Sequence, residues 1–215
     1  MLRALVAGTL ASLAFAAPAS ASEWAHPVNI VPVRAQPDTG AKRVTTTHML
    51  TEDKLPEVYL VLERDGNWVK VRIPGRPNGR TGWVRRDALG PIRTVSTRIT
   101  VDRKSLTLTL TKGGKTILKT RAGVGKAATP TPAGHFWVRE KLRFDNAPVY
   151  GTHALGTAAY AKVSDWPGGG VVGIHGTNQP QLIPGRPSHG CIRVRNADMA
   201  RLYRLTPIGT PITIR

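Results

Sequence analysis

The sequence has little of four things: cysteine, acidic residues, long apolar runs and helical periodicity. Its single cysteine, Cys191, excludes an intramolecular disulfide and leaves one thiol to be explained. Asp and Glu number 13 against 31 Lys and Arg, so the formal net charge is +18 and the chain would attract polyanions. After the opening residues no stretch is apolar enough to span a membrane, so a membrane-spanning protein is not expected.

The first 21 residues resemble an export signal. Arg3 precedes an apolar run from Ala4 to Ala17, which is shorter than the stretch of about 20 residues that a membrane span needs. The run ends in Ala19-Ser20-Ala21, a small-x-small pattern, so residues 1–21 are predicted to be a secretory signal peptide. The alternative is an uncleaved helix. We expect the protein to be exported, and to be cell-wall associated or periplasmic.

The positive charge is spread along the chain rather than gathered in a basic tail. A solvated basic surface is the simplest explanation. Since an exported protein rarely meets nucleic acid, no nucleic-acid partner is expected. Anionic cell-wall polymers and peptide carboxylates are the expected anions.

Frequent turns and short β-branched runs predict a mainly β chain, with 22 glycines and 17 prolines to break it into strands. In a first unit, residues 26–90, strands are predicted at Val58–Leu62, at Trp68–Ile73 and at Thr81–Val84. Asp65-Gly66-Asn67 predicts a hairpin turn between the first two, because Asp-Gly tolerates the positive φ that such turns need.

Three segments of this unit, VPVRAQPDTGAKRV, GNWVKVR and GRTGWVRRDAL, resemble bacterial SH3-like domains. The resemblance implies a small five- or six-stranded barrel of a kind that commonly docks onto cell wall. Trp68 and Trp83 would then form either a ligand platform or part of the barrel core, and the core is the favoured place for Trp68. Residues 91–97 are predicted to be a linker.

A second unit, residues 98–215, is also predicted to be mainly β, with one or two short helices. Leu106, Leu108 and Leu110 alternate along one strand, and a Gly113-Gly114 turn leads to a returning strand at Thr116–Thr120. Further on, a short apolar strand, Val171–Ile174, ends in His175. The best helix is Asn196–Arg204, with Asn196 as its N-cap. The helix side chains expected to pack inward are Ala197, Ala200, Leu202 and Tyr203, and GTPITIR is expected to close the chain as a strand.

The stretch SHGCIRVRNAD places Cys191 among groups that could activate a thiol. A free cysteine is mostly protonated at neutral pH, so it needs a base or a positive neighbour to attack a carbonyl. The candidates are His175, His189 and Arg193. We favour His175 as the base, because a strand end holds a side chain better than a loop does. His189 would then shape the loop.

Gly190 permits a tight backbone conformation next to the thiol. That conformation is expected to aim the N–H groups of Gly190 and Cys191 into one pocket, where they would stabilise an oxyanion.

The pattern GIHGT, a spacer and then SHGCIRVRNAD closely resembles the signature of the L,D-transpeptidases, the YkuD-type catalytic domain. AGVGKAATPTPAGHF upstream resembles another segment of that family, and GTPITIR resembles its last strand. The matching signature positions are His175, Gly176, Thr177, Ser188, His189, Gly190, Cys191, Arg193, Asn196 and Asp198. The resemblance covers the second unit and implies a β-sandwich or barrel.

The resemblance also implies a reaction on peptidoglycan stem peptides, with no cofactor and no metal. Cys191 would attack the carbonyl of the third, diamino residue of a tetrapeptide stem and release D-alanine. An amine of a neighbouring stem would resolve the thioester to a 3→3 cross-link, and His175 would move the protons. Arg193 would either anchor the loop, which we favour slightly, or bind a stem carboxylate. Ser188 would help to shape the site.

A mobile cap covers the site in this family, and Tyr150–Trp166 lies where that cap would fall. Tyr160 and Trp166 are therefore candidate substrate contacts, although ordinary packing explains them equally well. Gly176 and Thr177, which follow the base, are further candidates.

Three alternatives stay open. An L,D-carboxypeptidase would use the same acyl-enzyme with water as the acceptor, and amino-acid exchange or protein anchoring would use other acceptors. A non-catalytic wall-binding protein would predict a broken signature, yet every position is filled. A zinc hydrolase is disfavoured because His189 and Cys191 are too close for good tetrahedral geometry. The sequence predicts no oligomeric state.

Overall fold

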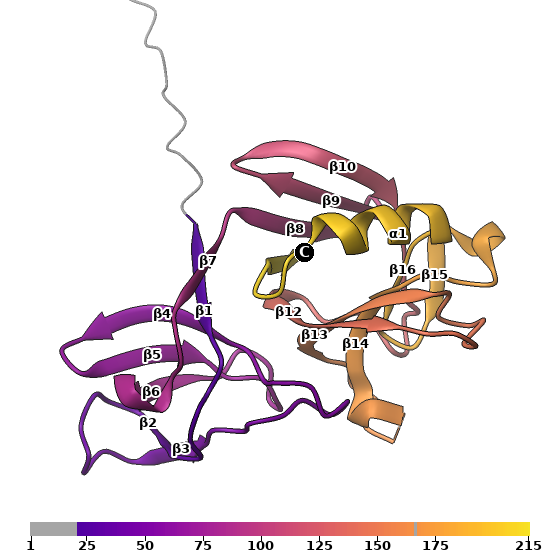
Figure 1. Ribbon diagram of the computed structural model, residues 1–215. Coiled ribbons are helices and arrows are strands. Elements are labelled where there is room, and N and C mark those ends of the chain that lie inside the picture. The colour runs from indigo at the N-terminus through magenta and orange to yellow at the C-terminus, as the bar shows by residue number, and fades with distance from the viewer. Residues whose placement is uncertain (1–20, 166) are drawn as a thin grey trace, which may run out of the picture.

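The computed structural model describes residues 21–165 and 167–215, and over these ranges the chain forms two β-sheets and a single α-helix (Figure 1). The prediction of a mainly β fold is confirmed. Apart from Ala21, the predicted signal peptide lies outside the described residues, as does Trp166.

The first sheet has seven strands in the order β3-β2-β6-β5-β4-β1-β7. The predicted hairpin is present: Gly66 turns the chain from β4 to β5 with a φ of +51°. In β5, Val69 and Val71 are buried while their neighbours are half-exposed. The strands are β1 (Ser22–Ala25), β2 (Pro32–Arg34), β3 (Arg43–Thr46), β4 (Tyr59–Asp65), β5 (Trp68–Arg72), β6 (Thr81–Arg85) and β7 (Arg93–Val95).

Trp83 is buried in this unit and Trp68 is half-buried, so Trp83 is not exposed as a ligand platform. The resemblance to SH3-like domains stays a prediction. The segment expected to be a linker contains β7, which pairs with β1 in the first sheet. Ser96 alone then separates β7 from the first strand of the second sheet.

The second sheet has ten strands in the order β10-β9-β8-β17-β12-β13-β14-β16-β11-β15. Parallel pairings bring β17 beside β8 and β16 beside β14, so segments far apart in sequence become neighbours. The strands are β8 (Thr97–Asp102), β9 (Thr107–Lys112), β10 (Lys115–Arg121), β11 (Gly123–Gly125), β12 (Gly134–Arg143), β13 (His153–Tyr160), β14 (Val171–His175), β15 (Gly185–Ser188), β16 (Ile192–Arg193) and β17 (Pro211–Ile214).

One hydrophobic core fills the curve of this sheet, and helix α1 (Asn196–Leu205) closes it through Met199 and Leu202 (Figure 1). The predicted inward positions were right for Leu202 and wrong for Ala197, which is exposed. Arg195, not Asn196, is the N-cap residue, and the Asn196 side chain instead accepts a hydrogen bond from the Thr177 N–H (2.7 Å). Three short 3₁₀ segments lie at Arg86–Ala88, Pro167–Gly170 and Pro180–Leu182.

The two sheets meet across a buried contact. Trp137 of β12 is 1% exposed, and its Nε1–H donates to the Val58 carbonyl of the first unit (2.8 Å). Beside it, Arg139 and Glu57 form an ion pair in which both side chains are 2% exposed. A hydrophobic cluster from both units surrounds this contact: Trp24, Val58, Leu60, Val95, Trp137 and Ala158. These contacts fix the first unit to β12 of the second sheet.

No helix in the described part of the chain has the length and apolar character needed to cross a membrane.

Candidate active site

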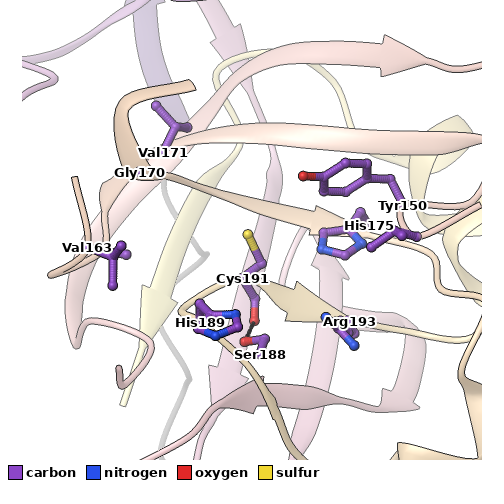
Figure 2. A pocket seen from close by; sticks show the side chains of 11 residues that line it. Tyr150, Val163, Gly170, Val171, His175, Ser188, His189, Cys191 and Arg193 are labelled. Atoms are coloured by element: carbon purple, nitrogen blue, oxygen red, sulfur yellow. Dashed lines mark hydrogen bonds between the residues drawn. The ribbon is translucent and has the colours of Figure 1, made fainter. Parts of the chain in front are cut away.

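Parallel pairing of β14 with β16 brings His175 and Cys191 together, although 16 residues separate them. His175 ends β14 and faces Arg193 of β16 in register, and Cys191 lies directly before β16. The thiol and the imidazole line one pocket of about 40 Å³, together with Tyr150 (Figure 2). Two signature segments therefore meet at one point of the sheet.

The Ser188–Cys191 turn is held by a chain of hydrogen bonds. Ser188 Oγ donates to the Cys191 carbonyl (2.6 Å, dashed in Figure 2), and it accepts from the Gly190 N–H (3.1 Å). The Thr131 hydroxyl donates to the Gly190 carbonyl (2.8 Å). Gly190 has a φ of +135°, and a Cβ there would lie 2.7 Å from that of Ala161, so only glycine fits.

This network corrects one expectation about the oxyanion donors. We expected the N–H groups of Gly190 and Cys191 to point into the pocket together. The Gly190 N–H is already satisfied by Ser188 Oγ, because the serine side chain folds back over its own turn. Ser188 lines the pocket, but its hydroxyl is used within the turn and the residue is 1% exposed.

His175 is in the protonation state that a general base requires. Its Nδ1 lies 2.6 Å from the Gly176 carbonyl, which can only accept, so Nδ1 carries the hydrogen and Nε2 keeps its lone pair. Burial, with a smaller effect from the Arg193 charge and against the Gly176 hydrogen bond, lowers the pKa of His175 to about 4. The imidazole is neutral at neutral pH.

Cys191 rests as a thiol. Burial raises its pKa, and a hydrogen bond from the Gly173 backbone and the charge of Arg193 oppose that shift only in part. A preformed thiolate–imidazolium pair is therefore not the resting state.

The remaining cationic candidates lie on either side of the thiol (Figure 2). His189 is exposed and its Nε2 lies 3.2 Å from Lys126 Nζ. Arg193 lines the pocket, and its Nη1 donates to Gln179 Oε1 (3.3 Å). Its Nε is buried and has no acceptor among the described residues. The Nε–H of Arg193 could therefore donate a hydrogen bond to a ligand.

The lower-ranked candidates lie elsewhere. The Gly176 carbonyl holds His175, and the Thr177 hydroxyl accepts from the Gln179 N–H (3.0 Å), so both residues support the base rather than line the pocket. Tyr160 lies at the contact between the units, where its hydroxyl donates to Glu52 and accepts from Arg139 Nη1 (3.1 Å). The structure does not bring Tyr160 into the pocket. Trp166 lies outside the described residues.

Sequence reasoning missed a second cavity, of about 220 Å³, which the same two residues also line. Cys191 and His175 line it together with Glu140 of β12 and Asp53 of the first unit. Tyr150 lines both cavities and packs edge-on against His175, with ring centroids 4.9 Å apart. Of Glu140, Asp53 and Tyr150, only Tyr150 could have been found from the sequence, because it is the first residue of the expected cap.

Across residues 21–165 and 167–215, no group of three or more His, Cys, Asp and Glu side chains is placed to hold a metal ion.

Comparison with known proteins matches the part of the chain that contains His175 and Cys191. The model of the L,D-transpeptidase catalytic domain (YkuD) matches residues 96–214. A Bacillus subtilis (strain 168) protein named L,D-transpeptidase YkuD is 33% identical over 121 residues, which are 56% of this chain and 67% of that protein. Escherichia coli (strain K12) YbiS, named in the same way, is 30% identical over 119 residues, or 47% of this chain and 38% of YbiS.

Among solved structures, the Enterococcus faecium L,D-transpeptidase C442S mutant is 30% identical and aligns with a TM-score of 0.45, covering 56% of this chain and 50% of that one. The match to YbiS and the structural match thus span half of those proteins or less. On the family match over residues 96–214, the chain belongs to the L,D-transpeptidase family of YkuD-type catalytic domains.

Proposed function

We propose that this protein is an exported peptidoglycan L,D-transpeptidase whose nucleophile is Cys191. One observation carries the proposal: the only thiol of the chain shares a pocket with a neutral histidine, and the Nε2 of that histidine has no hydrogen-bond partner in the described ranges. A thiol and a neutral base in one pocket are the parts that acyl transfer through a thioester needs.

In the first half-reaction, Sγ of Cys191 attacks the carbonyl carbon of the third residue of a donor tetrapeptide while His175 Nε2 takes the thiol proton. The Cys191 N–H is the remaining expected donor to the oxyanion. The bond to the terminal D-alanine then breaks, and His175 returns its proton to the leaving amine. A thioester on Cys191 and free D-alanine result.

In the second half-reaction, an amine of a neighbouring stem attacks the thioester carbonyl. His175 takes a proton from that amine and gives it to the departing thiolate, so the thiol is restored. The new amide is a 3→3 cross-link. Water in place of the amine would make the same site an L,D-carboxypeptidase.

Arg193 is proposed to bind a stem carboxylate. The buried Nε without an acceptor supports this role over simple anchoring of the loop, which we favoured on sequence alone. A carboxylate that accepts from Nε and one terminal nitrogen would complete the guanidinium fork. D-alanine carries such a carboxylate next to the bond that breaks.

Export and wall association also belong to the proposal. The apolar opening segment that ends at Ala21 supports export, and the net charge of +18 supports attraction to anionic wall polymers.

The test is to incubate the purified protein with a disaccharide tetrapeptide and to record the masses of the protein and of the products. An adduct absent from Cys191→Ala and His175→Ala, together with a dimer that lacks one D-alanine, is the expected result. A tripeptide without dimer would indicate a carboxypeptidase. No adduct and no product would overturn the proposal and favour a wall-binding protein.

A further inference from the structure

The 220 Å³ cavity beside the catalytic pair has an acidic wall, although the protein is strongly basic. Glu140 and Asp53 line the wall, and Cys191 and His175 line the same space. His175, which also lines this cavity, is 2% exposed, and its Nε2 has no hydrogen-bond partner in the described ranges. A substrate held at Cys191 therefore lies within reach of two carboxylates.

A row of residues across four strands explains this geometry. Glu140 of β12 pairs with Gly156 of β13, and Gly156 pairs with Gly173 of β14. Gly173 lies beside Cys191, because the next residues of β14 and β16 are paired. Residues directly opposite one another in a sheet present their side chains on the same face. Two glycines thus leave an open trough between an acid and the thiol.

The carboxylate of Glu140 leans along this trough. A Cβ on Gly156 would collide with Glu140 Oε1, so the acid lies over Gly156 and points toward the catalytic pair. Gly156 is two strand positions from Cys191, a distance of about 10 Å. A trough of that length fits a flexible side chain rather than a second folded element.

The two acids have no cation of their own. Glu140 is 2% exposed, and its Oε2 accepts from the Thr51 hydroxyl (2.6 Å). The nearby Arg139 is committed to Glu57 and Glu52, at 2.5 and 3.0 Å. Within the part of the chain that the structure describes, neither Glu140 nor Asp53 forms an ion pair.

Burying a carboxyl without a cation is costly. Burial raises the pKa of Glu140 to about 7 against the Thr51 hydrogen bond. The charge of Asp53 and a hydrogen bond with it add to the rise, and the Arg139 charge opposes it. A bound cation would remove this penalty, since it would stabilise both carboxylates at once.

We propose that Glu140 and Asp53 bind the side-chain ammonium of the diamino residue whose carbonyl Cys191 attacks. This inference rests on the proposed function and names the part of the site that selects the donor. An ammonium six bonds from the attacked carbon reaches about 7 Å when extended. An N–H···O contact adds about 3 Å, so the span matches the trough. Because Asp53 belongs to the first unit, both units take part in selecting the donor.

The experiment compares two synthetic tetrapeptides that differ only at the third residue. One carries diaminopimelate and the other carries 2-aminoheptanedioate, which lacks only the distal amine. The rate of Cys191 acylation is followed by intact-protein mass for the wild type, Glu140→Gln, Asp53→Asn and a control, Glu63→Gln. Glu63 is an exposed acid of β4 paired with Lys70 (3.3 Å), and it does not line the proposed pocket.

The wild type and Glu63→Gln should prefer the diaminopimelate donor by about tenfold or more in kcat/KM, as a charge-assisted hydrogen bond implies. Glu140→Gln and Asp53→Asn should lose most of that preference, because the ratio of the two rates reports only on the distal amine. Asp53 is exposed, so its variant should fold even if Glu140→Gln does not.

The outcomes separate the two proposals. Equal rates for both donors in the wild type, or an unchanged preference in both acid variants, would overturn this inference alone. No acylation by either donor would overturn the proposed function and this inference with it.

Discussion

The two sheets of this chain differ in what they bury. The core of the first unit is apolar, with Val33, Val69, Val71 and Val84 packed under the seven-stranded sheet. The second unit also has an apolar core. The opposite face of its strands β12, β13 and β14, however, carries buried charged side chains and glycines. The first unit covers part of that face with Asp53 and Glu57. Residues of the first unit thus cover polar groups that the second sheet leaves on its surface.

Breaking the contact between the units should have the largest effect on stability. Arg139→Met leaves Glu57 buried without its partner, so the free energy of unfolding should fall by about 3–5 kcal/mol. Urea unfolding followed by tryptophan fluorescence measures this loss. The control is Arg64→Met, which removes the exposed Arg64–Glu23 pair and should cost less than about 1 kcal/mol. Equal losses of unfolding free energy in the two variants would mean that the buried ion pair stabilises the fold no more than the exposed one.

The pH dependence of the unfolding free energy should further distinguish the two units, because the buried His175 of the second unit contributes to it. The pKa of His175 is about 4 in the folded state against an ordinary value of 6.5, so the unfolded chain binds the extra proton. The stability is present above pH 6.5 and is lost as the pH falls through 4, by roughly 3 kcal/mol in all. Unfolding free energies of the wild type and His175→Gln across this window should diverge in slope. Parallel curves would contradict the assignment.

Matched glycines in the two units allow the close packing at the site to be measured separately from backbone strain. Gly66 and Gly190 both have positive φ, but a Cβ at Gly66 meets open space, whereas at Gly190 it meets Ala161 at 2.7 Å. Gly66→Ala should therefore cost about 1 kcal/mol from strain. Gly190→Ala should cost about 2–3 kcal/mol and should also slow acylation. Thermal unfolding and acylation rates test both, and equal costs would show that the Ala161 contact is soft.

The smallest expected effect concerns the start of α1. Asn196→Ala removes the acceptor of the Thr177 N–H and should cost about 1 kcal/mol. Arg195→Ala, at the true N-cap position, removes no cap hydrogen bond and should be close to neutral. Amide hydrogen exchange at Thr177 should rise in the first variant only. A faster exchange in both would mean that the helix end, not the Asn196 side chain, protects this amide.

The sequence predicted local features well and contacts between units poorly. Alternation located β9, a turn located β5 and an apolar run located β14, because these patterns are set by neighbours in the chain. One long signature motif brought Cys191 and His175 to one pocket. Arg139, Glu57 and Tyr160 carry no such signal, since their partners lie 21 to 108 residues away. Asn196 was misassigned because an asparagine before a helix suits a cap, and tertiary packing of the Thr177 segment won instead.

The raised pKa of Cys191 has a consequence for the lifetime of the enzyme. Peroxides and disulfides react with a thiolate and hardly at all with a thiol. Under the proposed function, a cysteine that keeps its proton until a carbonyl arrives reacts only slowly with such oxidants. If the protein is exported as proposed, the neutral pair would make Cys191 a weaker nucleophile at rest but would slow the oxidation of the single thiol.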